Sequence, residues 1–298
     1  MKTKKLIPAL KDYIWGGTLL KNYRTTTLDK IGESWELSFL DAGPTQIEVD
    51  NKLVNLKDYV KEEDLGESIQ KFEFFPVLIK LINSQSNLSI QVHPNDEYAL
   101  KNENSLGKTE MWYILDAEEN AGIYVGFKNN ENEESLLKAI NNDTILDILN
   151  FRKVKKGECY FIPSGTIHAI GKGITLIEIQ QNSNLTYRLY DYHRKDKDGN
   201  ERELHVEKAL KVIDFNQYKN KQFKGNVIGE CKYFTSKHYL INEKKTHQYK
   251  NSFVEITFLE GNGTINNLEF KKFDSFFVPA NKRIVIKGKA EYILTYVK

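Results

Sequence analysis

The chain has 298 residues, and its 40% hydrophobic content with 16 Phe and 16 Tyr favours a folded, β-rich protein over a disordered one. Its 43 basic and 41 acidic residues give a formal net charge of +2, which excludes the strong field that nucleic acid or an anionic membrane would require. No apolar run is long enough to span a bilayer or form a signal peptide, and the two cysteines lie far apart, which predicts a cytoplasmic protein without a disulfide framework.

Strand-like runs dominate the chain. Runs rich in β-branched and aromatic residues predict strands at 74–82, 87–92, 111–115, 122–127, 159–162, 173–180 and 251–259. Helices are expected at 96–102, 131–150 and 204–213. The charged segment 194–202 is expected to be an exposed hairpin tip or loop. The polar stretch 216–224 predicts a boundary between an N-terminal unit at 1–215, with a helical insert at about 131–150, and a C-terminal unit at 216–298.

Four side chains form a candidate metal site. Alternation along the second predicted strand puts Gln91 and His93 on one face. The opposite face is expected to carry Leu88, Ile90 and Val92. Glu110 precedes the next strand, and His168 ends the turn Pro-Ser-Gly-Thr-Ile-His. Two imidazoles, one carboxylate and one amide suit zinc, with manganese, cobalt or iron as alternatives. A single histidine is more often a polar residue with a protein partner than a metal ligand, so the prediction depends on all four residues together.

Lys108 is a candidate for the same site. It stands two positions before Glu110, and a strand directs such side chains to one face. The alternative is an ordinary loop lysine. Glu36 and Glu178 are candidates to hold Lys108 or a ligand histidine in place, or to bind substrate.

Arg188 lies in the strand-like sequence Thr-Tyr-Arg-Leu-Tyr, between two residues that would occupy the other face. An inward guanidinium requires an anion, so a phosphate or carboxylate partner is expected. The alternative is a structural salt bridge to Asp191 or Glu178.

The chain contains a weak internal repeat. The segment 157–164 resembles 273–280, and 112–117 resembles 256–261. The first copy carries a longer spacer, by about the length of the helical insert and its flanks. In the second copy Ile284 replaces His168 and no glutamate replaces Glu110, so the repeat itself does not require these ligands.

Five ordered motifs carry a family resemblance. They are IWGGTLL at 14–20, IGESWELS at 31–38, QVHP at 91–94, GKTEMWY at 107–113 and EIQQNSNLTYRLYD at 178–191. Together they resemble class I mannose-6-phosphate isomerases, most closely the short form of Gram-positive bacteria. The resemblance implies a mainly β fold of two cupin-type β-barrel (jelly-roll) units with a small helical insert, of which the second unit has lost its metal ligands.

The resemblance also implies an activity. The chain would be a metal-dependent aldose–ketose isomerase that interconverts mannose 6-phosphate and fructose 6-phosphate through a cis-enediol. One Zn²⁺ per subunit would be held by Gln91, His93, Glu110 and His168. Lys108 and Arg188 would be catalytic residues on the open side of that metal. The chain departs from the longer relatives of this family at two positions. Gly107 stands where they have His, and Ile170 stands where they have Tyr, so fewer candidate acid–base groups remain.

Two other functions compete with this interpretation. A non-catalytic, sugar-sensing cupin would keep the metal only for structure and would tolerate loss of Lys108 and Arg188. A cupin dioxygenase would usually prefer more histidine ligands and a redox-active iron. The sequence assigns no oligomeric state.

Overall fold

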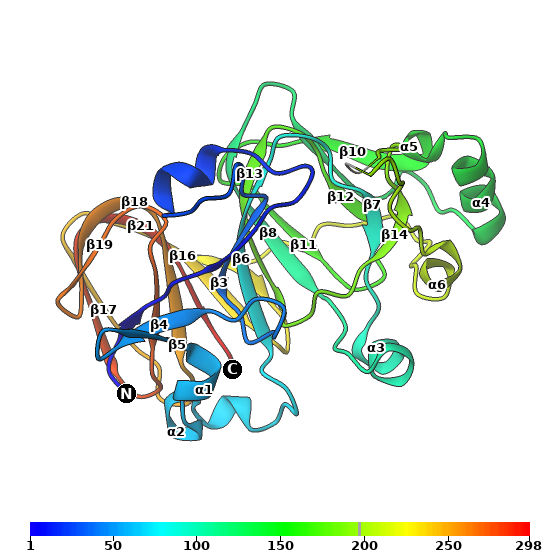
Figure 1. Ribbon diagram of the computed structural model, residues 1–298. Coiled ribbons are helices and arrows are strands. Elements are labelled where there is room, and N and C mark those ends of the chain that lie inside the picture. Colours follow the sequence, from blue (N-terminus) through cyan, green and yellow to red (C-terminus); the bar gives the residue numbers. More distant parts are fainter. Residues whose placement is uncertain (196–197) are drawn as a thin grey trace.

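The computed structural model describes residues 1–195 and 198–298, and it consists of two β units with helices at their edges (Figure 1). The strands pair antiparallel within every sheet. This arrangement confirms the mainly β, cupin-type prediction of two barrel units with a helical insert.

Two sheets build the first barrel within the described residues. One sheet has the order β11–β8–β13–β6–β3–β2. Its strands are β2 (Ala9–Lys11), β3 (Glu33–Leu37), β6 (Val77–Ser84), β8 (Glu110–Ala117), β11 (Cys159–Ile162) and β13 (Ile174–Gln181). The other sheet has the order β10–β9–β12–β7–β14. Its strands are β7 (Ile90–Val92), β9 (Gly122–Phe127), β10 (Leu149–Lys153), β12 (His168–Ile170) and β14 (Tyr187–Tyr190).

The second unit is built on a larger sheet with the order β1–β20–β18–β21–β16–β15, to which β17 and β19 add at the sides. Its strands are β1 (Lys4–Lys5), β15 (Val227–Glu230), β16 (Thr235–Ile241), β17 (Lys244–Gln248), β18 (Val254–Ile265), β19 (Leu268–Phe270), β20 (Ser275–Val278) and β21 (Arg283–Tyr296). The N-terminal strand β1 therefore belongs to the sheet of the C-terminal unit. A small hairpin, β4 (Gln46–Val49) and β5 (Lys52–Asn55), completes the strands described.

The helices are short and peripheral (Figure 1). They are α1 (Leu56–Tyr59), α2 (Glu62–Leu65), α3 (Asp96–Glu103), α4 (Glu133–Asn141), α5 (Ile145–Ile148) and α6 (Val206–Leu210), with 3-10 turns at Leu19–Tyr23 and Glu67–Ile69. No helix of the described ranges is long and apolar enough to cross a bilayer.

The central strands β6, β8 and β13 present each face to a different environment, as period-2 alternation requires. One face joins the two units through a common apolar core that contains Ile79, Leu81, Met111, Tyr113, Ile177 and Ile179 with Phe253, Phe277 and Ile293. The other face lines the first barrel, where Ile82 and Ile114 lie near the buried polar groups Lys80, Glu110 and Glu178. The proposed boundary at 216–224 stays a prediction.

The internal repeat has the same strand register in both units. Cys159 pairs with Tyr113 across β11 and β8, and the corresponding Ser275 pairs with Thr257 across β20 and β18. Val254 and Ile284 occupy the positions of Glu110 and His168, and both lie in the apolar core that fills the second barrel. The second unit therefore forms the same strand arrangement with apolar residues where the first has polar ones.

The helical insert differs from the single helix predicted at 131–150. It breaks into α4 and α5 around Asp143, whose φ of 56° lies in the left-handed region. The break falls in an Asn-Asn-Asp-Thr sequence, residue types that favour helix ends over helix interiors. The helix predicted at 204–213 is also shorter, at Val206–Leu210.

Leu88 does not share the environment of Ile90 and Val92, since it packs with the interior cluster of the first barrel while they pack beneath the helices.

The segment predicted as an exposed loop at 194–202 closes through a bridge between Lys195 and Glu201, and residues 198–201 are exposed; residues 196–197 lie outside the described part.

Glu255 is a fully buried carboxyl group at the junction of the two units. Thr257 donates a hydrogen bond to its Oε1, whereas Oε2 has no hydrogen-bond partner among the described residues. Burial and, to a smaller extent, the charge of Glu36 raise the pKa of Glu255 well above its ordinary value of 4.5, against the Thr257 hydrogen bond.

The Glu255→Gln variant should therefore gain stability over the wild type as pH rises. A carboxyl group with a raised folded-state pKa stabilises the fold fully below its unfolded pKa and loses that contribution as pH rises towards the folded value. The gap in unfolding free energy should widen above pH 4.5 by up to about 1.4 kcal/mol per pH unit. Urea denaturation between pH 5 and pH 8 measures this gap in unfolding free energy between the variant and the wild type. A gap that does not change with pH, or that also appears for the exposed Glu269→Gln, would contradict the assignment.

Candidate metal centre

The candidate ligands lie in or next to strands β7, β8 and β12, which bring them together inside the first barrel. Gln91 lies in β7 and His93 follows it, while Glu110 and His168 are the first residues of β8 and β12. His168 pairs directly with Gln91 across β12 and β7. His93, Glu110 and His168 are each at most 1% exposed, and their candidate ligand atoms all lie within 4.8 Å of one another.

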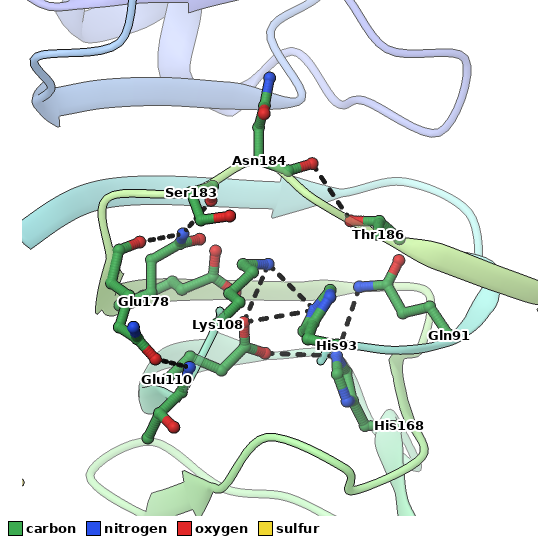
Figure 2. Close-up of polar contacts among 12 residues, drawn as sticks. Gln91, His93, Lys108, Glu110, His168, Glu178, Ser183, Asn184 and Thr186 are labelled. Atoms are coloured by element: carbon green, nitrogen blue, oxygen red, sulfur yellow. Dashed lines mark hydrogen bonds and ion pairs between the residues drawn. The ribbon is translucent and has the colours of Figure 1, made fainter. Parts of the chain in front are cut away.

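The distances within this group are short (Figure 2). His168 Nε2 lies 3.3 Å from Glu110 Oε1, and His93 Nε2 lies 3.6 Å from Glu110 Oε2. The amide nitrogen of Gln91 lies 3.3 Å from His168 Nε2. Since the nitrogen and oxygen of an amide exchange places by a half-turn, Gln91 can present its oxygen at the same position.

The protonation states suit a metal site. Burial lowers the pKa of His168 to about 4 and that of His93 well below its ordinary value, and nearby Lys108 lowers both further. Both rings are therefore neutral at pH 7, as a metal ligand must be. His168 Nδ1 donates to the carbonyl oxygen of Thr166 over 2.8 Å, which leaves the lone pair of Nε2 directed at Glu110 and Gln91.

Glu110 is the group that most requires a cation. Burial and the charge of Glu178 raise the pKa of Glu110 to about 7, although Lys108 opposes the shift. Its Oε1 accepts no hydrogen bond from the described residues. Ligands about 2.1 Å from a tetrahedral metal stand about 3.4 Å apart, close to the 3.3 Å and 3.6 Å that separate the two histidines from Glu110. The donor set and its spacing therefore fit a divalent metal.

Lys108 and two further charged residues adjoin this group. Lys108 Nζ lies 2.9 Å from Glu110 Oε2 and 3.0 Å from His93 Nε2 (Figure 2). Glu178 pairs with Lys80 over 3.1 Å and accepts a hydrogen bond from the Trp112 indole. Burial alone would raise the pKa of Glu178, but the charges of Lys108 and Lys80 lower it to about 2. Glu178 is therefore a carboxylate at neutral pH.

A cavity of about 250 Å³ opens beside the metal-binding group. Polar and charged side chains contribute much of its wall, namely Glu33, Lys80, Ser89, Gln91, Lys108, Glu178, Asn184, Thr186, Arg188 and Arg202. Two tryptophans, Trp15 and Trp35, also line it. Its size and its mixture of aromatic and polar groups suit a small polar ligand.

Arg188 lies in this wall, directly opposite Gln91 in the pairing of β14 with β7. Its Nη1 donates to the Glu203 carbonyl oxygen, and its buried Nε has no hydrogen-bond partner among the described residues. Asp191 pairs instead with Arg194 and Arg202, so the structure does not form the alternative salt bridge from Arg188 to Asp191 or Glu178 within the described ranges. The guanidinium keeps capacity for an anion.

The structure does not bring Glu36 to the site, and the prediction that it supports Lys108 or a ligand histidine is wrong. Glu36 points from β3 towards the second unit, where Arg24, Ser34 and Ser275 donate to it. Glu33, three residues earlier on the opposite face of β3, lines the cavity instead.

Lys80, Glu33 and Arg202 are charged residues of the cavity wall that sequence reasoning missed. Lys80 is fully buried, and burial would lower its pKa, but Glu33 and Glu178 raise it above the ordinary value. A lysine in the otherwise apolar run Val-Leu-Ile-Lys-Leu-Ile was the available signal, because a buried charge requires a partner.

Gly107 has a steric reason to be glycine. A Cβ atom there would lie 2.4 Å from the Asn95 carbonyl carbon and 2.5 Å from the Asp96 nitrogen. The backbone before Lys108 therefore lies directly against the chain that follows His93.

A cupin barrel with a buried His–Glu–His group beside a charged cavity defines a metal-binding cupin. Residues 3–124 match the family model "Phosphomannose isomerase type I, catalytic domain". Mannose-6-phosphate isomerase ManA of Bacillus subtilis is 36% identical over 97% of each chain, and mannose-6-phosphate isomerase of Streptococcus mutans is 34% identical over 85% of this chain and 83% of its own.

Solved structures agree with these relatives. The crystal structure of mannose 6-phosphate isomerase from Bacillus subtilis has a TM-score of 0.90 and 33% identity over the whole of both chains. A putative mannosephosphate isomerase from Archaeoglobus fulgidus shares the fold, with a TM-score of 0.83 at 22% identity over 99% of this chain and 97% of its own. The chain belongs to the type I mannose-6-phosphate isomerase family, which confirms the resemblance seen in its motifs.

The His168→Ala variant should lose its metal but keep its fold. One of three buried ligands disappears, so metal content per chain should fall at least roughly tenfold. The barrel should persist because the second unit forms the same strand pairing around Ile284. Elemental analysis and far-UV circular dichroism measure the two outcomes. The matched control is His247→Ala, a buried histidine of the second unit bonded to Tyr292. Full metal occupancy in His168→Ala would exclude His168 as a ligand.

Proposed function

We propose that the protein interconverts mannose 6-phosphate and fructose 6-phosphate with one zinc ion per chain, held by Gln91, His93, Glu110 and His168. The observation that carries this proposal is a buried N/O donor set whose carboxylate requires a cation, at the wall of a charged cavity, in a chain of this family. When bound, the metal supplies Lewis-acid stabilisation of negative charge on the O1 and O2 side of the sugar. Zinc is preferred because two imidazoles with oxygen donors are its common ligands.

Isomerisation moves a hydrogen between C1 and C2, so the site must accept and return a proton. Lys108 is the proposed proton carrier, since its ammonium group lies at the cavity wall beside Glu110 and His93. Glu178 lies close to Lys108, whose charge lowers the pKa of Glu178. Lys80 forms an ion pair with the same carboxylate over 3.1 Å.

Arg188 is proposed to bind anionic oxygens of the sugar phosphate. It shares the cavity wall with Arg202, and the two guanidinium groups are close enough that Arg202 contributes to lowering the pKa of Arg188, after burial. Asp191 is the carboxylate that pairs with both Arg194 and Arg202. Three guanidinium groups, Arg188, Arg194 and Arg202, therefore face two carboxylates, Asp191 and Glu203, and the excess of one positive charge suits a phosphate.

The competing function, a sugar sensor with a structural metal, is less well supported by this cavity. Such a protein has no need for a lysine beside the metal-binding group or for an arginine that forms no salt bridge to a carboxylate within the described part of the chain. A cytoplasmic location is part of the proposal, in keeping with the free cysteines Cys159 and Cys231.

The direct test is to add mannose 6-phosphate to the purified protein and follow fructose 6-phosphate with and without a chelator. Turnover should disappear on chelation and return with Zn²⁺. The Lys108→Met variant should retain the metal but lose most turnover and the exchange of the C2 hydrogen with solvent. A wild-type protein that binds hexose 6-phosphates without turnover or exchange would favour the sensor, and turnover that survives complete metal removal would exclude a metal-dependent isomerase.

The Arg188→Lys variant should lose turnover by roughly two orders of magnitude, because it keeps the charge but loses the planar donor pair that suits phosphate or enediolate oxygens. Steady-state kinetics with mannose 6-phosphate measure the effect. Arg194→Lys is the matched control, since Arg194 is a nearby arginine that pairs with Asp191 and does not line the cavity. Unchanged kinetics in Arg188→Lys would give Arg188 a structural role.

A further inference from the structure

The backbone that carries Lys108 is held by hydrogen bonds at three consecutive residues, Gly107–Thr109, which we call the Lys108 strap. The Gly107 amide donates to Asp96 Oδ1 over 3.0 Å, and the Lys108 amide donates to the Pro94 carbonyl oxygen over 3.0 Å. The Thr109 amide donates to Gln181 Oε1 over 2.8 Å. No metal ligand takes part in these bonds.

Asp96 holds both ends of this strap, directly at Gly107 and through Gln181 at Thr109. Its Oδ1 accepts from Gly107 and also from Gln181 Nε2 over 2.7 Å. The second bond fixes the orientation of the Gln181 amide, and so turns its oxygen towards the Thr109 amide. A shift of the Asp96 carboxylate would therefore displace the hydrogen-bond acceptors of the residues on both sides of Lys108.

The second unit reaches Asp96 through two residues between β15 and β16. The Tyr233 hydroxyl donates a short hydrogen bond to Asp96 Oδ2, and Lys232 Nζ lies 3.2 Å from the same oxygen. Tyr233 is only 8% exposed and belongs to the core that joins the two units. Partial burial raises the pKa of Asp96, but the bonds from Tyr233, Gln181 and Gly107 outweigh it and keep the group ionised at neutral pH.

We propose that Asp96 and Tyr233 are positioning residues for Lys108, through which the ligand-free C-terminal unit becomes part of the active site. This inference rests on the proposed function for its effect on turnover. A movement of Asp96 would also displace the Lys108 strap, because Gly107 lies against the Asn95–Asp96 backbone too closely to accept even a Cβ atom. A displacement of about 1 Å in a reacting group costs up to roughly a hundredfold in rate.

The kinetic test compares Tyr233→Phe, Asp96→Ala and the double variant in the metal-loaded, full-length protein. Asp96→Ala should lower kcat roughly ten- to a hundredfold and Tyr233→Phe by a smaller factor, with KM and metal content little changed. The double variant should be no slower than Asp96→Ala, because Tyr233 acts through Asp96. Additive losses, or a loss explained by missing metal, would overturn the proposal.

The matched control is Tyr218→Phe. Tyr218 is 9% exposed, close to the 8% of Tyr233, and its hydroxyl lies within hydrogen-bond distance of the Phe161 carbonyl oxygen and of Asn220 Oδ1. The variant therefore also loses a tyrosine hydroxyl with hydrogen-bond partners, but away from the strap. Its kcat should stay at the wild-type value. An equal loss of kcat in Tyr218→Phe and Tyr233→Phe would show a general effect of buried tyrosine hydroxyls and overturn the proposal.

Hydrogen exchange tests the same inference without turnover. Amide exchange in the peptide 105–110 should be faster in Tyr233→Phe and Asp96→Ala than in the wild type, and unchanged in Tyr218→Phe. Unchanged exchange in both variants would overturn the positioning role even in an active enzyme. If the wild type shows no isomerase activity but the strap amides respond as expected, the proposed function fails while the connection from Tyr233 to the strap stands.

Discussion

The charge on Glu110 is the constraint on which the site depends. A carboxylate that is completely buried loses the solvation of water, and a neighbouring carboxylate, Glu178, increases the cost. Two neutral imidazoles and a lysine 2.9 Å away surround Glu110, and the spacing of the donor atoms fits a divalent cation. Glu178 is in turn stabilised by Lys80 and Lys108. The interior of the first barrel therefore contains a network of alternating charges beside apolar side chains such as Ile82 and Ile114.

The second unit shows what the fold requires without such a network. It repeats the register of β8 and β11 in β18 and β20, and fills the positions of Glu110 and His168 with Val254 and Ile284. One of its buried carboxyl groups, Glu255, lies on the opposite face of β18, towards Glu36 and the first unit. The first barrel thus keeps buried charge for chemistry. The second keeps an apolar interior and contributes to the site from outside, through Tyr233.

Much of this could be predicted from the sequence where the determinants are local. Period-2 alternation placed Gln91 and His93 together, and spacing placed Lys108 beside Glu110. The same rule did not decide which face of β3 meets the cavity, because Glu33 and Glu36 both stand in a strand buried on both faces. Leu88 departed from its expected face because β7 begins only at Ile90, so alternation did not extend to it. The break at Asp143 was visible in its residue types but weaker than the apolar periodicity around it.

Contacts between residues distant in the chain were beyond such reasoning. Tyr233 meets Asp96 across 137 positions, and no periodicity or motif connects them. The partners of Lys80 depend equally on the sheet order β13–β6–β3, which brings Glu178 and Glu33 to either side of it. Motif resemblance supplied the ligand set, but only the assembled barrel shows how the charges around it balance.

Crystallographic anomalous scattering at a metal absorption edge would locate the ion itself. We expect one ion per chain, about 2.0–2.2 Å from His93 Nε2, His168 Nε2 and a Glu110 carboxylate oxygen, with the Gln91 amide oxygen as the fourth protein ligand. An ion bound at full occupancy elsewhere in the chain, with Glu110 contacted only by Lys108, would contradict this assignment.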